Sequence, residues 1–215
     1  MNEGILTDAL PETITAWDEC KKVMGLPRGH FLFHQGEPAE GLYVILSGFI
    51  KLYRTGAAGD LQVVRLVGPG GVLGHRSLMA REPLGATAEV IQDASFCFVP
   101  GNLVLDTLDG DPAVAWNMMR ILARSLGQSE GRLLAVARMS TGARVASLLL
   151  EYADPDTGLF MVALTREEIG QVIGATTESV SRVLRSWESL GVIALEGRSI
   201  RILDRPALVG SASPA

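Results

Sequence analysis

The 215-residue sequence predicts an α+β protein with an N-terminal β-roll of the jelly-roll type, one long helix, and C-terminal helices followed by a β-hairpin. Three observations predict this class. Residues 29–100 are a series of short β-like segments between glycine turns, residues 112–138 keep a helical repeat of apolar side chains, and residues 164–203 indicate two helices and two strands. Hydrophobic residues make up 47% of the chain, which is enough for packed cores.

The N-terminal region has the pattern of many short strands. The segments are Leu42–Leu46, Phe49–Tyr53, Leu61–Val67, Ala86–Ile91 and Ser95–Val99. The turn signals that separate them include Ser47-Gly48, Gly56 to Asp60 and Gly68 to Gly71. Short strands with glycine turns favour a barrel or jelly roll, so we expect a β-roll domain over residues 1–110.

A long helix is expected from about Pro112 to Arg138, and we assign residues 111–138 as a dimerisation helix. Written as heptads, six residues fall on successive a and d positions, and Ser129 is the polar exception among them. These residues are Met119, Leu122, Leu126, Ser129, Leu133 and Val136. A narrow apolar seam of this length suits a partner helix and predicts a symmetric homodimer. The alternative, a helix packed on its own barrel, stays open at this point.

Two shorter helices are expected after residue 164. Thr165 and Glu168 form a capping box, which starts a helix that buries Ile169, Val172 and Ile173 and ends at Gly174. Thr176 or Thr177 caps the second helix, and Gly191 supplies a left-handed stop. Its apolar positions are Val180, Val183, Leu184, Trp187 and Leu190. Two helices joined by such a tight turn are typical of a helix-turn-helix.

A hairpin follows the second helix. Residues 192–195 and 199–203 are short strands about the glycine turn of residues 196–198, and such a hairpin is the wing of a winged helix. We therefore expect a winged helix-turn-helix DNA-binding domain over residues 139–215. The expected DNA contacts are Thr177, Glu178, Ser181, Arg182 and Arg185 on the polar face of the second helix, with Thr165 and Arg198 beside it.

The polar face has the chemistry of base recognition. Arg donates two hydrogen bonds to guanine, Glu accepts from the amino group of cytosine or adenine, and Ser tolerates a thymine methyl. The alternative is an ordinary solvated helix surface, but the hairpin that follows favours the DNA reader. Two such readers in a symmetric dimer would face a palindrome with half-sites about one helical turn apart.

Composition restricts the remaining possibilities. The net charge of −5 argues against non-specific binding of nucleic acid by the whole surface, but not against local recognition. No apolar run approaches the roughly 18 residues of a membrane span and no signal peptide is evident, so we expect a cytoplasmic protein without a membrane partner. Cys20 and Cys97 lie far apart, and neither sits in a Cys-x-x-Cys pair, so we predict no metal site.

From Leu26 to Leu203 the chain resembles the cyclic-AMP receptor protein/FNR family of bacterial transcription regulators. The motifs are Phe33–Pro38, Gly41–Gly48 with Lys51–Arg54, Gly68–Gly74, Leu164–Gly170 and Glu178–Arg182. The resemblance implies a cyclic-nucleotide-binding-like sensor β-roll, a homodimer on double-stranded DNA, and RNA polymerase as a further partner. The Glu-x-x-Ser-Arg sequence looks like the FNR type, which implies a TTGA(T/C)-like half-site. The family resemblance does not imply an enzyme.

The effector pocket departs from the cyclic-AMP pattern of this family. The Glu that holds the ribose is replaced by His75, and the position of the Arg that holds the phosphate is Leu84. Loss of the guanidinium removes a charge-assisted bidentate contact, so cyclic AMP bound in the usual way is not expected. The pocket residues implied by the resemblance are Gly74, His75, Arg76, Ser77, Leu84, Ala86, Thr87 and Ser129.

The cofactor and the signal are left open. The iron–sulfur cluster of FNR needs clustered N-terminal cysteines, and Cys20 alone cannot supply them. Haem is an alternative, with His30, His34 and His75 as candidate axial ligands. A small metabolite, a gas or redox signal, or control by protein level alone would also fit. The alternative of another class is a cupin-like metal-dependent enzyme fused to a helical domain, with the same histidines as ligands.

Overall fold

The computed structural model describes residues 4–56, 61–197 and 199–212. The chain divides into two compact units. One comprises the residues up to Arg54 together with Arg65–Ser129, and the other comprises residues 55–64 together with the chain from Glu130 onward. Within the described ranges, no helix is long and apolar enough to cross a bilayer.

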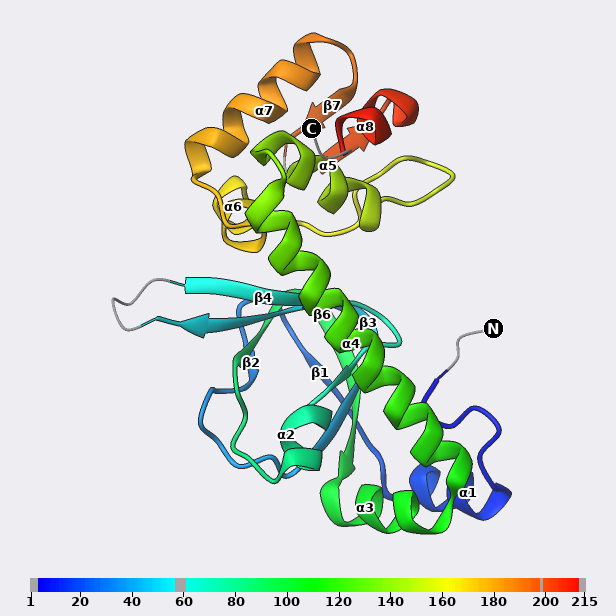
Figure 1. Cartoon of the computed structure of the whole chain (residues 1–215). Helices are drawn as coiled ribbons and strands as arrows, with labels where there is room; N and C mark the ends of the chain where they lie inside the picture. Colours follow the sequence, from blue (N-terminus) through cyan, green and yellow to red (C-terminus); the bar gives the residue numbers. More distant parts are fainter. Residues whose placement is uncertain (1–3, 57–60, 198, 213–215) are drawn as a thin grey trace. The chain divides into compact units, whose positions relative to one another are not determined.

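The N-terminal unit is built on an antiparallel six-stranded sheet (Figure 1). The strands are β1 (Lys22–Leu26), β2 (Phe31–Phe33), β3 (Gly41–Thr55), β4 (Leu61–Val67), β5 (Val72–Leu73) and β6 (Thr87–Pro100). The sheet order is β1-β6-β3-β4, with β2 also paired to β6 and β5 to β3. This arrangement agrees with the β-roll expected from the glycine-punctuated strands.

The Ser47-Gly48 pair is not the turn that the sequence predicts, because β3 continues through it as one long strand. The register between β3 and β6 shifts at Ile45/Ser47, Ser47/Phe49 and Phe49/Ile50, so the pair lies in a bulged stretch. Gly48 has a φ of +77°, and a Cβ there would lie 2.2 Å from the Asp93 carbonyl oxygen. The two predicted strands at 86–91 and 95–99 are likewise one strand, β6. The expected turn at Gly56 to Asp60 falls largely on residues 57–60, outside the described residues.

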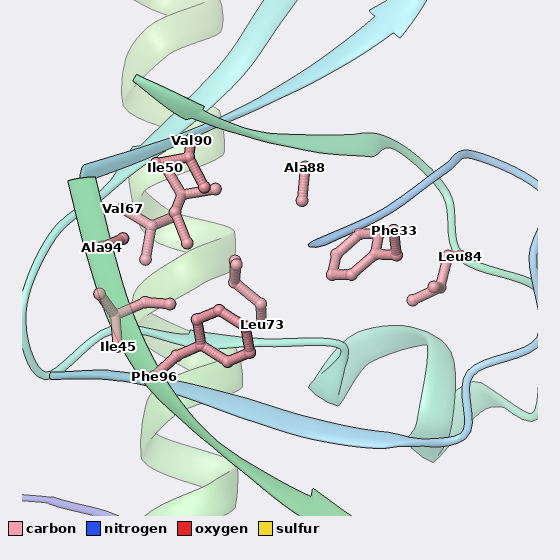
Figure 2. Packing of buried hydrophobic residues seen from close by; sticks show 10 residues of the cluster. All are labelled: Phe33, Ile45, Ile50, Val67, Leu73, Leu84, Ala88, Val90, Ala94 and Phe96. Atoms are coloured by element: carbon pink, nitrogen blue, oxygen red, sulfur yellow. The ribbon is translucent and has the colours of Figure 1, made fainter. Parts of the chain in front are cut away.

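Two apolar clusters fill the N-terminal unit. Ten buried residues from β2–β6 and the loops between them form the first cluster (Figure 2), and they include Phe33, Leu84 and Phe96. The second cluster joins the sheet to helices and contains Trp17, Val104 and Val114. Burial of these side chains removes apolar surface from water, which stabilises the fold.

The helices of this unit are α1 (Pro11–Cys20), α2 (His75–Ala80), α3 (Gly101–Gly110) and the first part of α4 (Pro112–Arg138). The sequence patterns did not predict α1, α2 or α3. Trp17 Nε1 in α1 donates a 2.9 Å hydrogen bond to Thr107 Oγ1 in α3, which ties the two helices together. The buried Asp111 carboxylate accepts from the Leu10 amide at 2.7 Å, and this hydrogen bond is the main cause of its lowered pKa.

Helix α4 has two kinds of apolar residue. Val114 and Met118 are buried in the second cluster, and Leu122 packs partly against it. Four other residues of the predicted seam are exposed within the single chain: Met119 (47%), Leu126 (61%), Leu133 (72%) and Val136 (56%). Leu122 therefore packs within its own chain, whereas the other four apolar residues of the seam are exposed in the single chain.

The C-terminal unit contains α5 (Thr141–Glu151), α6 (Arg166–Ile173), α7 (Thr177–Ser189), β7 (Ile193–Glu196), β8 (Ser199–Ile202) and α8 (Arg205–Ser211). Helix α5 packs against α6, α7 and α8. Its buried face, which includes Val145, Ala146 and Leu149, supplies the platform on which the two shorter helices rest. Helices α6 and α7 and the β7–β8 hairpin follow the predicted order and lie within two residues of the predicted limits.

Candidate nucleic-acid interface and effector region

Helix α6 begins with the predicted capping box. The Thr165 amide donates to Glu168 Oε2 at 2.7 Å, and the Glu168 amide donates to Thr165 Oγ1 at 3.1 Å. Ile169 and Ile173 are buried as predicted, and Val172 is half-buried. Reciprocal bonds of this kind satisfy amide groups that the first helical turn would leave unpaired. The start of the helix pair is therefore determined by two residues three positions apart in the sequence.

The turn between α6 and α7 depends on two glycines. Gly174 has a φ of +65°, as predicted for a left-handed helix end. Gly170, inside α6, makes a close contact that the sequence reading did not identify: a Cβ there would lie 2.6 Å from the Ala175 carbonyl oxygen. The Ala175 amide also donates to the Gly170 carbonyl oxygen at 2.9 Å. A glycine inside a helix destabilises it by about 1 kcal/mol relative to alanine. A glycine in the middle of a predicted helix is therefore the sequence feature that could have indicated this close contact.

Arg144 of α5 fastens the C-terminal end of α6. Its Nη1 atom donates to the Ile173 carbonyl oxygen at 2.6 Å and to the Gly174 carbonyl oxygen at 3.2 Å. A cation at a helix C-terminus satisfies unpaired carbonyl groups and complements the helix dipole. The sequence reading missed this residue, because Arg144 lies about thirty positions from the carbonyl groups it binds.

Helix α7 is amphipathic, as expected. Thr176 caps it, with Oγ1 accepting from the Ser179 amide at 3.3 Å. Val180, Leu184 and Trp187 are buried against the rest of the unit. The prediction for Leu190 was wrong: its side chain is 72% exposed. Leu190 is the C-cap residue, which follows the last residue of α7 and precedes Gly191 at φ +70°.

The polar face of α7 is available for binding in this chain. Thr177, Glu178, Arg182 and Arg185 are exposed, and Ser181 is half-buried. Glu178 and Arg182 are four residues apart and therefore project from the same face of the helix. The exposed Thr165 uses its hydroxyl oxygen in the capping box of α6. Arg198, also predicted to contact DNA, lies outside the described residues.

The β7–β8 hairpin has the register expected of a wing. Ile193 pairs with Ile202 and Glu196 with Ser199, and Gly197 in the turn has a φ of +65°. Arg201 Nε lies 3.3 Å from Glu196 Oε1, so this guanidinium is engaged within the hairpin. The Phe160 amide donates to the Ile200 carbonyl oxygen at 2.8 Å, which attaches the hairpin to the preceding segment.

The expected effector residues of the N-terminal unit divide into buried and exposed ones. Gly74 has a φ of +82°, and His75 and Ser77 are buried. Burial, followed by the Arg65 charge, lowers the pKa of His75 to about 4, so the imidazole is neutral at pH 7. His75 Nδ1 has no hydrogen-bond partner among the described residues. The exposed Arg76 lies 2.8 Å from Glu82 Oε2 and contacts Ser77 Oγ at 3.3 Å.

The segment before β6 contains the other expected pocket residues. Leu84 is 5% exposed and belongs to the first apolar cluster (Figure 2). Thr87 Oγ1 is buried and accepts from the Gln35 amide at 3.0 Å, and Ala86 is half-buried. Ser129, expected in both the pocket and the seam, is exposed and donates to the Ser125 carbonyl oxygen at 2.8 Å.

The candidate metal and haem ligands differ in exposure. His30 and His34 are exposed, and His75 is buried. Over residues 4–56, 61–197 and 199–212, no three or more His, Cys, Asp or Glu side chains gather in a way that could hold a metal ion. The cupin-like enzyme therefore gains no support from the arrangement of the histidines.

Comparisons with known proteins identify two domain families in the chain. The family of the cyclic nucleotide-binding domain matches residues 23–111, and the Crp-like helix-turn-helix domain matches residues 143–210. A CRP-like cAMP-activated global transcriptional regulator of Mycobacterium tuberculosis is 30% identical over 211 residues, covering 95% of this chain and 94% of that protein. The transcriptional activator protein Anr of Pseudomonas aeruginosa is 27% identical, with coverage of 90% and 82%.

A solved structure has a similar fold over most of the chain. FixK2 from Bradyrhizobium japonicum superposes with a TM-score of 0.83 at 26% identity, over 91% of this chain and 98% of that one. The chain matches the models of both domains, and it also matches full-length relatives over most of their length. The chain belongs to the CRP/FNR family of transcription regulators.

Proposed function

We propose that this protein is a cytoplasmic, sequence-specific regulator that binds a TTGA(T/C)-like palindrome as a homodimer and has no enzymatic activity. The observation that carries this proposal is the exposed polar face of α7, held in place by the capping box, the Gly170 contact and Arg144. Glu178, Ser181 and Arg182 are the proposed base-reading residues, since their side chains can donate to or accept from base edges. Their Glu-x-x-Ser-Arg sequence resembles the FNR type, which implies the TTGA-type half-site.

The remaining predicted contacts support these three. Thr177 and Arg185 flank them on α7, and Thr165 stands at the start of α6, where a helix N-terminus can approach a DNA phosphate. Arg198 is proposed as a phosphate contact of the wing. In this division, residues 1–110 sense the signal, residues 111–138 dimerise and residues 139–215 bind DNA.

The exposed seam of α4 is the proposed dimer contact. Leu126 and Leu133 are among its most exposed apolar side chains, and exposed leucines repeated along one helix favour burial against a second copy. A two-fold dimer would present two α7 helices to the two halves of a palindrome. RNA polymerase is the proposed further partner on the promoter.

The proposed signal is an effector other than cyclic AMP bound in the family's usual way. The Mycobacterium tuberculosis relative is named as cAMP-activated. In this chain, however, Leu84 is an apolar core residue where a guanidinium would hold the cyclic phosphate, and His75 is buried and neutral. Haem stays a second candidate, which an absorption spectrum of the purified protein tests through the Soret band.

The decisive experiment measures DNA binding by fluorescence anisotropy. The wild type should prefer a TTGA-type palindrome to a scrambled duplex of the same composition, under at least one ligand or redox condition. Arg182→Ala should cost about 1 to 3 kcal/mol of specific binding and relax the preference at one G·C pair. Arg205→Ala, at the start of α8, is the matched control for loss of one exposed positive charge. Equal losses on specific and scrambled DNA would contradict the base-reading role of Arg182.

A further inference from the structure

Helix α4 has two stripes of mostly apolar residues side by side on its surface, an inner stripe and an outer stripe. The inner stripe faces the second apolar cluster of the N-terminal unit, and the outer stripe begins the seam proposed to bind a second copy. Because an α-helix has about 3.6 residues per turn, stripes that differ by one position along the chain lie about 100° apart. The inner stripe is Val114, Met118, Ile121 and Ser125, and the outer stripe is Ala115, Met119, Leu122 and Leu126.

Apolar packing alone selects weakly between the two stripes. A helix turned by about 100° about its axis would place the outer stripe against the second cluster. Met119 would then take the place of Met118, and Leu126 would replace Ser125 and add an apolar side chain to the contact. Only Ala115 is clearly smaller than its inner counterpart. The turned helix would hide the seam from a second copy, so something other than hydrophobic burial has to disfavour it.

Arg65 of β4 favours the observed rotation at the end of the inner stripe. Its Nη1 atom donates to Ser125 Oγ at 3.2 Å, and its Nη2 atom donates to the Val72 carbonyl oxygen at 2.9 Å. Val72 is buried in the second cluster and pairs with Val44 of β3, so the sheet holds the guanidinium in place. In the turned helix, Leu126 would lie against this half-buried cation in place of the Ser125 hydroxyl. The loss of an acceptor from a charged donor is unfavourable.

Asn117 has the same effect nearer the start of α4. Its side chain is buried, and Nδ2 donates to the carbonyl oxygens of Ile5 at 3.2 Å and Thr7 at 2.7 Å. After the rotation, Met118 would occupy this position and both carbonyl groups would lose their donor. Buried polar side chains can specify one alignment of a helix, because the misaligned helix leaves polar groups unpaired.

We propose that Arg65 and Asn117 set the rotation of α4 and thereby keep Met119 and Leu126 turned toward a second copy of the chain. The hydrogen bonds that set the rotation belong entirely to the N-terminal unit. Their importance for dimerisation rests on the proposed homodimer. Both are positioning residues, since they act on the dimer contact through α4 and not by touching the partner.

Analytical ultracentrifugation of the full-length protein measures the effect on the dimer. The variants are Arg65→Met, Asn117→Leu and the two combined, which remove the polar groups but keep most of the apolar volume. The double variant should dimerise at least about tenfold more weakly than wild type, and each single variant should lie between them. The matched control is Arg81→Met, which removes an exposed positive charge at the C-terminal end of α2 and should leave the dissociation constant unchanged.

Thiol labelling reports the rotation of α4 without requiring a dimer. Met119→Cys is placed in a Cys20→Ser background, because Cys20 is exposed and Cys97 is buried. Maleimide labelling rates are extrapolated to infinite dilution. Residue 119 should react readily in the observed rotation and at least about fivefold more slowly when Arg65→Met and Asn117→Leu are added, because it then turns into the buried place of Met118.

The two measurements separate the rotation of α4 from the existence of the dimer. Slower labelling together with weaker dimerisation would support the proposal, and an unchanged labelling rate in the double variant would overturn it. A wild type that stays monomeric would contradict the proposed homodimer, while the labelling rates would still decide the rotation. Far-ultraviolet circular dichroism shows whether each variant is folded, and Arg65→Met alone decides the comparison if the double variant is not.

Discussion

The buried His75 makes the stability of the N-terminal unit depend on pH. Its side chain is 5% exposed, and desolvation, with a further contribution from Arg65, lowers its pKa from 6.5 to about 4. The unfolded chain therefore binds a proton at a higher pH than the folded chain does. Stability from this group is fully present above pH 6.5 and is lost as the pH falls toward 4. The full effect is about 3 kcal/mol, since one pKa unit corresponds to about 1.4 kcal/mol.

The intermediate value can be worked out for a convenient pH. At pH 5 an unfolded-state histidine is almost fully protonated, whereas folded His75 is about one-tenth protonated. Linkage then gives a loss of about 2 kcal/mol relative to pH 7. The matched variant is His75→Leu, which has no titrating group at this position. Wild type should lose about 2 kcal/mol more than this variant between pH 7 and pH 5.

The assay is urea unfolding followed by tryptophan fluorescence. Trp17 and Trp116 lie in the N-terminal unit and Trp187 in the other, so both proteins should carry Trp187→Phe to restrict the signal to the N-terminal unit. Proton NMR of the His75 ring gives the pKa independently, with His30→Gln used to assign the resonances. An imidazole that titrates near 6.5, or a wild-type-minus-variant difference that stays constant from pH 7 to pH 5, would refute the reasoning.

Three further predictions concern the helices. Gly170→Ala should destabilise the C-terminal unit by about 1 to 3 kcal/mol, because the new Cβ would meet the Ala175 carbonyl oxygen. The control Gly210→Ala should have little effect, because no atom lies within 4 Å of its Cβ position. Equal unfolding midpoints for the two variants in urea would contradict the close contact. Arg144→Met should lower the unfolding free energy of that unit by about 1.5 to 3 kcal/mol, because two carbonyl groups at the end of α6 lose a charged donor. Thermal unfolding measures this loss, with Arg138→Met as the control at an exposed site. Similar small losses in both variants would contradict the role of Arg144 at the end of α6. Leu126→Asp should give monomers that bind a palindrome poorly, since it places a charge in the exposed seam of α4; sedimentation of a dimer of unchanged mass would be the opposite result.

The sequence predicts the DNA-binding unit better than it predicts the β-roll. The capping box of Thr165 and Glu168, the left-handed Gly174 and the apolar repeat of α7 each depend on residues within a few positions of one another. Local hydrogen bonds and helical periodicity can be read without knowing the rest of the fold. The same periodicity does not bury Leu190, which lies at the C-cap of α7 and is exposed.

The β-roll depends on pairing between strands that are distant in sequence. The local pattern of apolar and turn residues does not specify which strands pair. Ser47-Gly48 has the composition of a turn, but pairing with β6 carries the chain through it as a bulged strand. Helices α1 and α3 were missed, and they are held by long-range contacts such as Trp17 with Thr107. Turn propensity is a local preference, and the pairing of whole strands outweighs it.

The sequence by itself determined the order of the elements from α6 to β8, the start and end of the helix pair and the polar face of α7, because short-range hydrogen bonds and side-chain periodicity encode them. Only the tertiary structure decided that Leu122 packs on its own unit while Leu126 stays exposed, that His75 is buried and neutral, and that Arg144 and Gly170 shape the turn before α7. It also brought Arg65 of β4 to Ser125 of α4. These features depend on which distant atoms share a space, and burial and close approach exist only once the chain has folded.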